Sequence, residues 1–367
     1  MSEEIEGQVS PDKKKLDIKK LLKSVLAFKS SDLHLVVGSE PQIRIDKELR
    51  ALKLPVLDAK DIETMAYALI EDKQKKEFEE HNELDFSFEL KNIGRFRANY
   101  YRTIHGIACA FRMIPIEIPT LDEYGNPPIF KELIKKEKGL ILVTGPTGSG
   151  KSTTLASMLH EINMTERRHI ITIEDPVEFV HKNINSLFSQ RDVGSNTASF
   201  AAALKYSLRQ DPDIILIGEM RDAETIGAAL TAAETGHLVF GTLHTNSAPG
   251  TINRIIDVFD GDEQAQVRAQ LASSLIAVIS QTLIPRVGSG KVATQEILIT
   301  NPAVQNQIRE DKVHQIYSQM QLNQTETKMT TQTQQLLEFL QKNIISKENA
   351  IKNSNRPEEL IKMIGSL

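Results

Sequence analysis

The chain has 367 residues, of which 40% are hydrophobic and 25% are charged, and its formal net charge is -5. This length exceeds one ordinary core and predicts two domains, while the acidic balance argues against nucleic-acid binding through a general basic surface. A single cysteine, Cys109, excludes a disulfide framework and a cysteine-rich zinc module, and fits the cytoplasm. No apolar run approaches the roughly 18 residues of a membrane span, so we expect membrane association only through a partner.

The first half of the chain predicts a small α+β domain. Residues 1–15 are polar and charged and are expected to form a disordered leader before that domain, which we place at 16–114. The apolar patterns predict helices at 16–28 and 58–79 and strands at 32–37, 42–45, 84–88, 94–100 and 107–113. Four prolines between residues 115 and 128 cannot continue a helix or a central strand, so we place the linker at 115–128.

The second domain is expected at 129–300. Its apolar strands alternate with helices, which is the pattern of a parallel, doubly wound sheet. The predicted strands are 140–143, 169–173, 213–219 and 237–244. Because right-handed crossovers bring the carboxyl ends of such strands to one edge, residues at these ends can share one site.

Residues 301–367 are expected to form a helical region and tail. The stretch 316–335 is rich in Gln and Thr and has the composition of a mobile loop. A last helix containing Leu336, Leu337, Leu340 and Ile344 is expected to cover the core, and the structure of the tail after Ile345 is left open.

A glycine-rich loop follows the apolar strand 140–143. In the sequence Gly-Pro-Thr-Gly-Ser-Gly-Lys-Ser-Thr, glycines let successive backbone N–H groups turn toward phosphate oxygens. We expect Lys151 to reach the β- and γ-phosphates of ATP and the Ser152 hydroxyl to hold Mg²⁺. The alternative is a chance match in a Gly-rich turn, which the strand before the loop and the helical spacing after it disfavour. The predicted nucleotide-binding residues here are Gly145, Thr147, Gly148, Ser149, Gly150, Lys151, Ser152 and Thr153.

Acidic residues and histidines follow or flank the other strands of this domain. Glu219 is expected to orient Mg²⁺ through its water shell, the alternative being an ordinary solvated acid at a strand end. Glu178 is the candidate general base for the attacking water, with Glu174 as its competitor. His244 is the candidate γ-phosphate sensor, and His237 at the other end of the same strand is a further catalytic candidate, although many such histidines are only structural. Metal ligation by these histidines lacks suitable spacing.

Together these segments resemble four motifs of the secretion-superfamily hexameric ATPases, and among them the type IV pilus retraction ATPases of the PilT family. The motifs are Walker A at 145–153, the Asp box at 173–181, Walker B at 211–222 and the His box at 234–246. The resemblance extends from about residue 16 to 346. It implies a PAS-like N-terminal domain, a RecA-like P-loop ATPase domain, and a hexameric ring that hydrolyses ATP to remove pilin from a pilus base. It also implies that Glu178 is the catalytic base and Glu219 the Walker B acid.

The same resemblance implies where the protein acts and with what. It predicts a cytoplasmic homohexamer that is peripheral at the inner-membrane pilus base and contacts the pilus platform protein, without binding nucleic acid directly. Whether a second retraction ATPase works alongside is left open. The resemblance further implies that Arg97 and Arg112 of the N-terminal domain contact the nucleotide, although each alone reads as a surface arginine on a sheet.

Pilus-assembly and type II secretion ATPases resemble the same core, but they carry an extra N-terminal domain and a four-cysteine zinc module. Residues 286–292 pass through that point without cysteine, which favours the retraction kind. Two departures remain. Residues 303–310 read Ala-Val-Gln-Asn-Gln-Ile-Arg-Glu, where the family motif resembles Ala-Ile-Arg-Asn-Leu-Ile-Arg-Glu, so the partner contacts are left open. Residues 46–48 read Asp-Lys-Glu where relatives usually have Asp-Gly, which predicts a different hairpin turn.

Two other classes of function compete with a motor. A nucleic-acid translocase with a RecA-like core would need a basic channel or stacking aromatics, but aromatic residues are 5% of the chain and tryptophan is absent. A noncatalytic subunit that uses ATP only to assemble is disfavoured by the presence of Lys151, Glu178 and Glu219.

Overall fold

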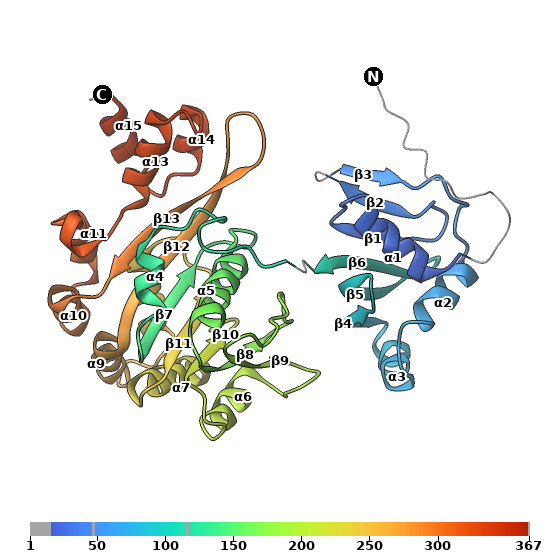
Figure 1. Ribbon diagram of the computed structural model, residues 1–367, viewed down its shortest axis with the longest axis horizontal. Helices are drawn as coiled ribbons and strands as arrows, with labels where there is room; N and C mark the ends of the chain where they lie inside the picture. Colours follow the sequence, from blue (N-terminus) through green and yellow to red (C-terminus); the bar gives the residue numbers. More distant parts are fainter. Residues whose placement is uncertain (1–15, 46–47, 115–116, 366–367) are drawn as a thin grey trace. The chain divides into compact units, whose positions relative to one another are not determined.

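The computed structural model describes residues 16–45, 48–114 and 117–365. The chain divides into two compact units, one ending at Glu117 and the other beginning at Ile118 (Figure 1). The predicted leader at 1–15, most of the altered turn at 46–48 and the first two residues of the predicted linker lie outside the described residues. Each unit is described by itself.

The first unit is an α+β domain with one antiparallel sheet of six strands, in the order β3-β2-β1-β6-β5-β4. The strands are β1 (Asp32–Leu35), β2 (Gln42–Ile45), β3 (Glu48–Ala51), β4 (Glu83–Leu90), β5 (Gly94–Thr103) and β6 (Gly106–Ile114). The helices are α1 (Ile18–Ala27), α2 (Ala59–Tyr67) and α3 (Asp72–His81). The predicted architecture is therefore confirmed, whereas β3 was not predicted.

The single helix predicted at 58–79 is two helices, which corrects that prediction. Asp58 begins α2 as expected, since its carboxylate accepts the backbone N–H of Asp61 at 2.8 Å. A second helix, α3, begins at Asp72, and the backbone N–H of Glu71 just before it donates to the side chain of Gln74 at 3.1 Å. A second capping arrangement inside an apolar pattern thus interrupts what the pattern alone predicts to be continuous.

The second unit is built on a seven-stranded sheet in the order β13-β12-β7-β11-β10-β8-β9. The strands are β7 (Gly139–Thr144), β8 (His169–Glu174), β9 (Leu187–Asp192), β10 (Ile214–Ile217), β11 (Leu238–Leu243), β12 (Leu275–Pro285) and β13 (Lys291–Ile299). All neighbouring pairs are parallel except β12 with β13. The predicted parallel, doubly wound sheet is confirmed, whereas β9, β12 and β13 were not among the predicted strands.

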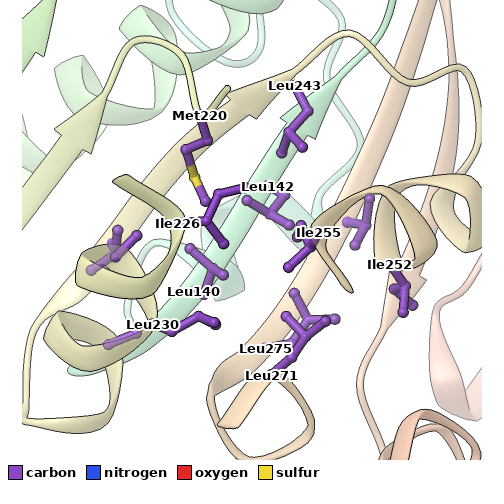
Figure 2. Packing of buried hydrophobic residues seen from close by; sticks show 14 of the residues in the cluster. Leu140, Leu142, Met220, Ile226, Leu230, Leu243, Ile252, Ile255, Leu271 and Leu275 are labelled. Carbon is purple, nitrogen blue, oxygen red and sulfur yellow. The ribbon is translucent and has the colours of Figure 1, made fainter. Parts of the chain in front are cut away.

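Helices pack on both faces of this sheet. Alternate residues of β7 enter two different cores, with Leu140 and Leu142 in one (Figure 2) and Ile141 and Val143 in the other. The first core includes residues of α7 (Ala223–Glu234), α8 (Ala248–Asp257) and α9 (Gln264–Ser274), whereas the second includes α4 (Ile129–Leu133) and α5 (Lys151–Thr165). Helix α6 (Phe200–Ser207) packs into the first core. Burial of the sheet on both faces explains why its strands read as continuous apolar runs.

The expectation of a mobile loop at 316–335 was wrong. This stretch contains α11 (Ile316–Met320), α12 (Gln324–Thr327) and the start of α13 (Gln332–Gln341), preceded by α10 (Pro302–Arg309) and η1 (Val313–Gln315). Ile316 and Met320 are fully buried at a spacing of four residues, so two apolar anchors outweigh the polar composition. The tail forms α14 (Lys347–Lys352) and α15 (Pro357–Gly365), which pack with α13 in a separate core. In the described residues, no helix is long and apolar enough to cross a membrane.

Candidate active site

The glycine-rich loop joins the carboxyl end of β7 to the N-terminus of α5, as its sequence context predicts. Gly145 has φ = 141°, and a Cβ added there would lie 2.1 Å from the backbone oxygen of Gln281, so no other residue fits. Gly148 has φ = 76° and open space around it, so its backbone can be approached closely. The loop therefore has the shape that a phosphate cradle needs at a helix N-terminus.

A cavity of about 460 Å³ opens beside this loop, at the carboxyl ends of β8, β10 and β11. It brings together the loop from Thr147 to Thr153 with Glu178, Glu219 and His244, and it also includes Glu174, the competing candidate base. The remaining lining residues are Tyr124, Asp175, Pro176, Phe200, Gly218, Thr242 and Leu283. Gly145 is not part of the lining and lies behind the loop, against Gln281.

Lys151 supplies the positive charge of the cavity. Its Nζ donates to the carbonyl oxygens of Gly145 at 2.7 Å and Pro146 at 3.2 Å. Burial lowers the pKa of this ammonium, and the nearby carboxylates of Glu219 and Glu178 act in the opposite direction. Lys151 is thus a partly desolvated cation beside two acidic groups, in the position that phosphate charge requires.

Glu219 is held between two cationic or protonatable groups. Arg221 donates from Nη2 to one carboxylate oxygen at 2.5 Å, and Nε2 of His244 lies 3.1 Å from the other. The hydrogen bond from Arg221 is the main cause that lowers the pKa of Glu219, although burial opposes it. Glu219 is therefore a carboxylate at neutral pH, fixed in orientation, and it links His244 directly to the Walker B segment.

Glu174 and Glu178 lie four residues apart on the same side of the cavity. The backbone N–H of Glu178 donates to the Glu174 carboxylate at 3.3 Å, while the side chain of Glu178 is exposed. Burial raises the pKa of Glu174 to about 7. An exposed carboxylate can reach a water in the cavity, so Glu178 remains the candidate base, and Glu174 is built into the wall that positions it.

His237, the further catalytic candidate, does not line this cavity, and its catalytic role stays a prediction. It precedes β11, and its Nδ1 lies 3.0 Å from the backbone oxygen of Ala232. The six residues of β11 lie between it and His244, which makes seven steps along the strand, or roughly 23 Å at 3.3 Å per residue. The two histidines flank one strand and therefore lie at opposite edges of the sheet.

Arg97 and Arg112 belong to the first unit, where they face each other across β5 and β6. Arg97 Nε donates to Asp85 at 3.0 Å, and Arg112 Nε donates to Asp32 at 2.8 Å. Asp32 is buried and lies directly opposite Arg112 in the pairing of β1 with β6. Both arginines thus have carboxylate partners within their own unit, and their contact with nucleotide stays a prediction.

Sequence reasoning missed several residues of the site, among them Tyr124, Thr242 and Gln281. Tyr124 lines the cavity but lies in the proline-rich segment predicted as linker; residues from Ile118 belong to the second unit, and Leu121 is buried in its core. Thr242 lines the cavity and donates to the backbone oxygen of Gly218. Gln281 supports the loop from behind, and the signal for it was a polar residue inside the apolar run of β12.

The lining fits a magnesium–nucleotide complex. Mg²⁺ takes oxygen ligands and is typically held by one or two protein groups together with phosphates and waters. The Ser152 hydroxyl and the Glu219 carboxylate offer such oxygens on the same cavity that Lys151 and the glycine-rich loop supply with donors. These are the residues that would hold the ion and the phosphates.

Comparison with known proteins agrees with this geometry. Residues 9–362 match the family described as "Type II/IV secretion system protein". The chain is 50% identical over 343 residues to the "Type IV pilus retractation ATPase PilT" of Pseudomonas aeruginosa, covering 94% of this chain and 99% of that protein. It is 49% identical over 321 residues to the "Twitching motility protein" of Neisseria gonorrhoeae, covering 87% and 86%.

A solved structure extends the likeness to the fold. The crystal structure of the pilus retraction motor PilT with bound ADP matches with a TM-score of 0.90 at 47% identity, covering 95% of this chain and all of that one. The family match spans nearly the whole chain, and the relatives are similar over nearly their whole lengths. The chain belongs to the type II/IV secretion system protein family and is of the PilT kind within it.

Proposed function

We propose that this chain is an ATPase that powers type IV pilus retraction by removing pilin from the pilus base. The observation that carries the proposal is the single cavity that gathers the glycine-rich loop, Glu178, Glu219 and His244. The names of the similar proteins, a pilus retraction ATPase and a twitching motility protein, support the same function.

Each group of residues in the cavity has a separate role in ATP hydrolysis. Lys151 and the backbone N–H groups of the loop bind the β- and γ-phosphates, and Glu178 accepts a proton from the attacking water. Ser152 and Glu219 would hold Mg²⁺, which would supply charge stabilisation to the phosphate oxygens. His244 contacts both Glu219 and the cavity, so its ring is placed to sense whether a γ-phosphate is present.

The N-terminal arginines complete this mechanism in the proposal. A guanidinium group binds phosphate oxygens bidentately, and Arg97 and Arg112 lie opposite each other on neighbouring strands, so one ligand can meet both. Asp85 and Asp32 hold the two side chains in defined positions. Contacts made only with triphosphate would shift the domains on binding and hydrolysis, which is the condition for converting turnover into motion.

We infer a homohexamer, cytoplasmic and peripheral at the inner-membrane pilus base, that acts on the pilus through a platform protein. Gln305 and Gln307, the two altered positions of the family's retraction-linked motif, lie on α10, whose Val304 and Ile308 are buried. The substitutions thus fall beside the buried positions of that helix and not on them.

The test is pilus number and length on cells that lack the protein. Loss of a retraction motor leaves many pili that do not shorten, whereas loss of an assembly motor leaves none. Restoring the gene should return shortening. Cells without pili, or cells whose pili still retract, would contradict the proposed function.

A further inference from the structure

Gln281 is a buried amide in the middle of an apolar strand. Its side chain has no solvent exposure, and β12 around it reads Leu-Ile-Ala-Val-Ile-Ser-Gln-Thr-Leu-Ile-Pro. Burying an amide is unfavourable unless its groups are hydrogen-bonded. Here all the contacts of the amide lead toward the glycine-rich loop or the residues behind it.

We propose that Gln281 is a positioning residue that orients the phosphate-binding loop. Its Nε2 donates to the backbone oxygen of Ser149 at 2.7 Å. Because the C=O and N–H of a trans peptide point in opposite directions, fixing the Ser149 carbonyl toward the core points the Gly150 N–H away from it. Gly150 lines the cavity on that other side, so the donor is aimed where a phosphate oxygen binds.

The backbone and side chain of Gln281 also set the position of the loop by close contact. A Cβ added at Gly145 would lie 2.1 Å from the Gln281 backbone oxygen, and one added at Gly150 would lie 2.9 Å from Nε2. The glycine-rich loop therefore lies directly on this residue at two points. Because a side chain at either position would collide with Gln281, only glycine lets the loop pack this closely against it.

Two neighbours that do not line the cavity also fix the amide. Its Oε1 accepts hydrogen bonds from Thr154 Oγ1 at 2.8 Å and from Gln295 Nε2 at 2.9 Å. Gln295 also donates to Asn126 at 2.9 Å, and its backbone N–H donates to the side chain of Gln335 on α13. With both ends satisfied, the amide has one orientation, which is what a preorganised donor array requires.

The inference rests on the proposed ATPase function, and binding measurements test it separately. Gln281→Met keeps the length and volume of the side chain and removes the donor to Ser149. We expect the Kd for ADP and for inorganic pyrophosphate to rise about 10-fold, the size of effect that follows from misaligning one well-placed donor. The affinity for AMP, which lacks the β-phosphate, should fall less than the affinity for ADP. The KM for ATP should rise by a larger factor than kcat falls.

A matched pair of milder variants separates positioning from stability. Thr154→Val deletes the hydrogen bond to Gln281, whereas Thr294→Val deletes a hydrogen bond of 3.2 Å to the Thr282 backbone oxygen, between β13 and β12 and one residue along from Gln281 without touching its amide. Both threonines are fully buried, so both variants should lose similar stability. We expect about 3-fold weaker pyrophosphate binding for Thr154→Val and no change for Thr294→Val.

The outcomes are distinguishable. If Gln281→Met fails to fold, the Thr154→Val and Thr294→Val pair decides, since a Thr to Val change preserves shape. Equal pyrophosphate affinity in wild type, Gln281→Met and Thr154→Val, or equal losses in Thr154→Val and Thr294→Val, would overturn the inference. A wild-type protein that binds neither ADP nor pyrophosphate would instead contradict the proposed function.

Discussion

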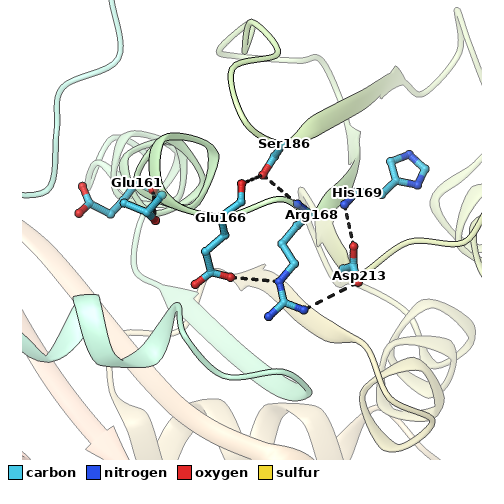
Figure 3. A network of polar contacts seen from close by, with 7 residues as sticks. Glu161, Glu166, Arg168, His169, Ser186 and Asp213 are labelled. Carbon is cyan, nitrogen blue, oxygen red and sulfur yellow. Dashed lines mark hydrogen bonds and ion pairs between the residues drawn. The ribbon is translucent and has the colours of Figure 1, made fainter.

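The two edges of the parallel sheet carry the same kinds of residues but use them differently. At the amino ends, Arg168 Nε donates to Glu166 at 3.0 Å and its Nη1 lies 3.8 Å from Asp213, which also accepts the His169 N–H at 2.8 Å (Figure 3). Ser186 joins the network by accepting the Arg168 N–H and donating to the Glu166 backbone. These groups bind one another and connect β8, β9 and β10.

At the carboxyl ends, a lysine, glutamates and a histidine line a cavity instead. Lys151, Glu178 and His244 all face the same space of about 460 Å³. Residue type therefore does not identify a site in a doubly wound sheet, whereas the end of the strand does. His237 and His244 flank one strand, and only the one after its carboxyl end reaches the cavity.

The strongest test of the carboxyl edge is Lys151→Ala. Removing the ammonium should abolish ATP turnover, because no other lysine lines the cavity among the described residues. Lys151 is the first residue of α5 and is only half-buried, so the free energy of unfolding should change by less than about 1 kcal/mol. An ATP hydrolysis assay of the purified variant measures turnover, and denaturant unfolding measures its stability. A normal rate of hydrolysis would show that the glycine-rich loop is not part of the active site.

The amino edge is tested by Arg168→Leu. The substitution leaves Glu166 and Asp213 without their cationic partner in a partly buried network, so we expect the free energy of unfolding to fall by about 2 kcal/mol. The KM for ATP should stay near the wild-type value. Urea unfolding measures the first and steady-state kinetics the second. Unchanged stability would show that this network does not hold the strands together.

A smaller effect should appear in the pH dependence of stability. The native pKa of Glu174 is raised to about 7, so the folded protein binds this proton more tightly than the unfolded chain does. Stability from this group is fully present below about pH 4.5 and is lost as pH rises through 7, amounting to about 1 kcal/mol after allowance for its partial exposure. Glu174→Gln should flatten the unfolding free energy over this window. An identical pH profile in the variant would contradict the raised pKa.

Much of the second unit was predictable from sequence, because fully buried strands and the glycine-rich loop are strong local signals. The parallel strands, the loop before α5 and the shared position of Glu178, Glu219 and His244 all followed from strand ends and crossover handedness. The predictions that failed concern features that depend on tertiary contacts. Tyr124 was hidden by surrounding prolines, and the fold of 316–335 by its polar composition, although Ile316 is fully buried.

Gln281 shows where sequence reasoning stops. A polar residue in an apolar strand signals a buried hydrogen bond, but its partner Ser149 is 132 positions away in the chain. Only the packing of β12 beside β7 brings the two together. The same limit applies to Arg168, because its partners Ser186 and Asp213 precede other strands and are distant in the chain.

The central claim is that the carboxyl edge performs chemistry while the amino edge holds the sheet. The most direct test is one matched measurement of ATP turnover and unfolding on Glu178→Gln and Glu166→Gln, the same change at the two edges. We predict that Glu178→Gln loses about 10²- to 10⁴-fold in kcat with unchanged stability, since a general base is removed from an exposed position. Glu166→Gln should keep its kcat and lose about 1 kcal/mol of stability, because its bond to Arg168 is weakened. A loss of kcat in Glu166→Gln as large as in Glu178→Gln, or full activity in Glu178→Gln, would contradict the account.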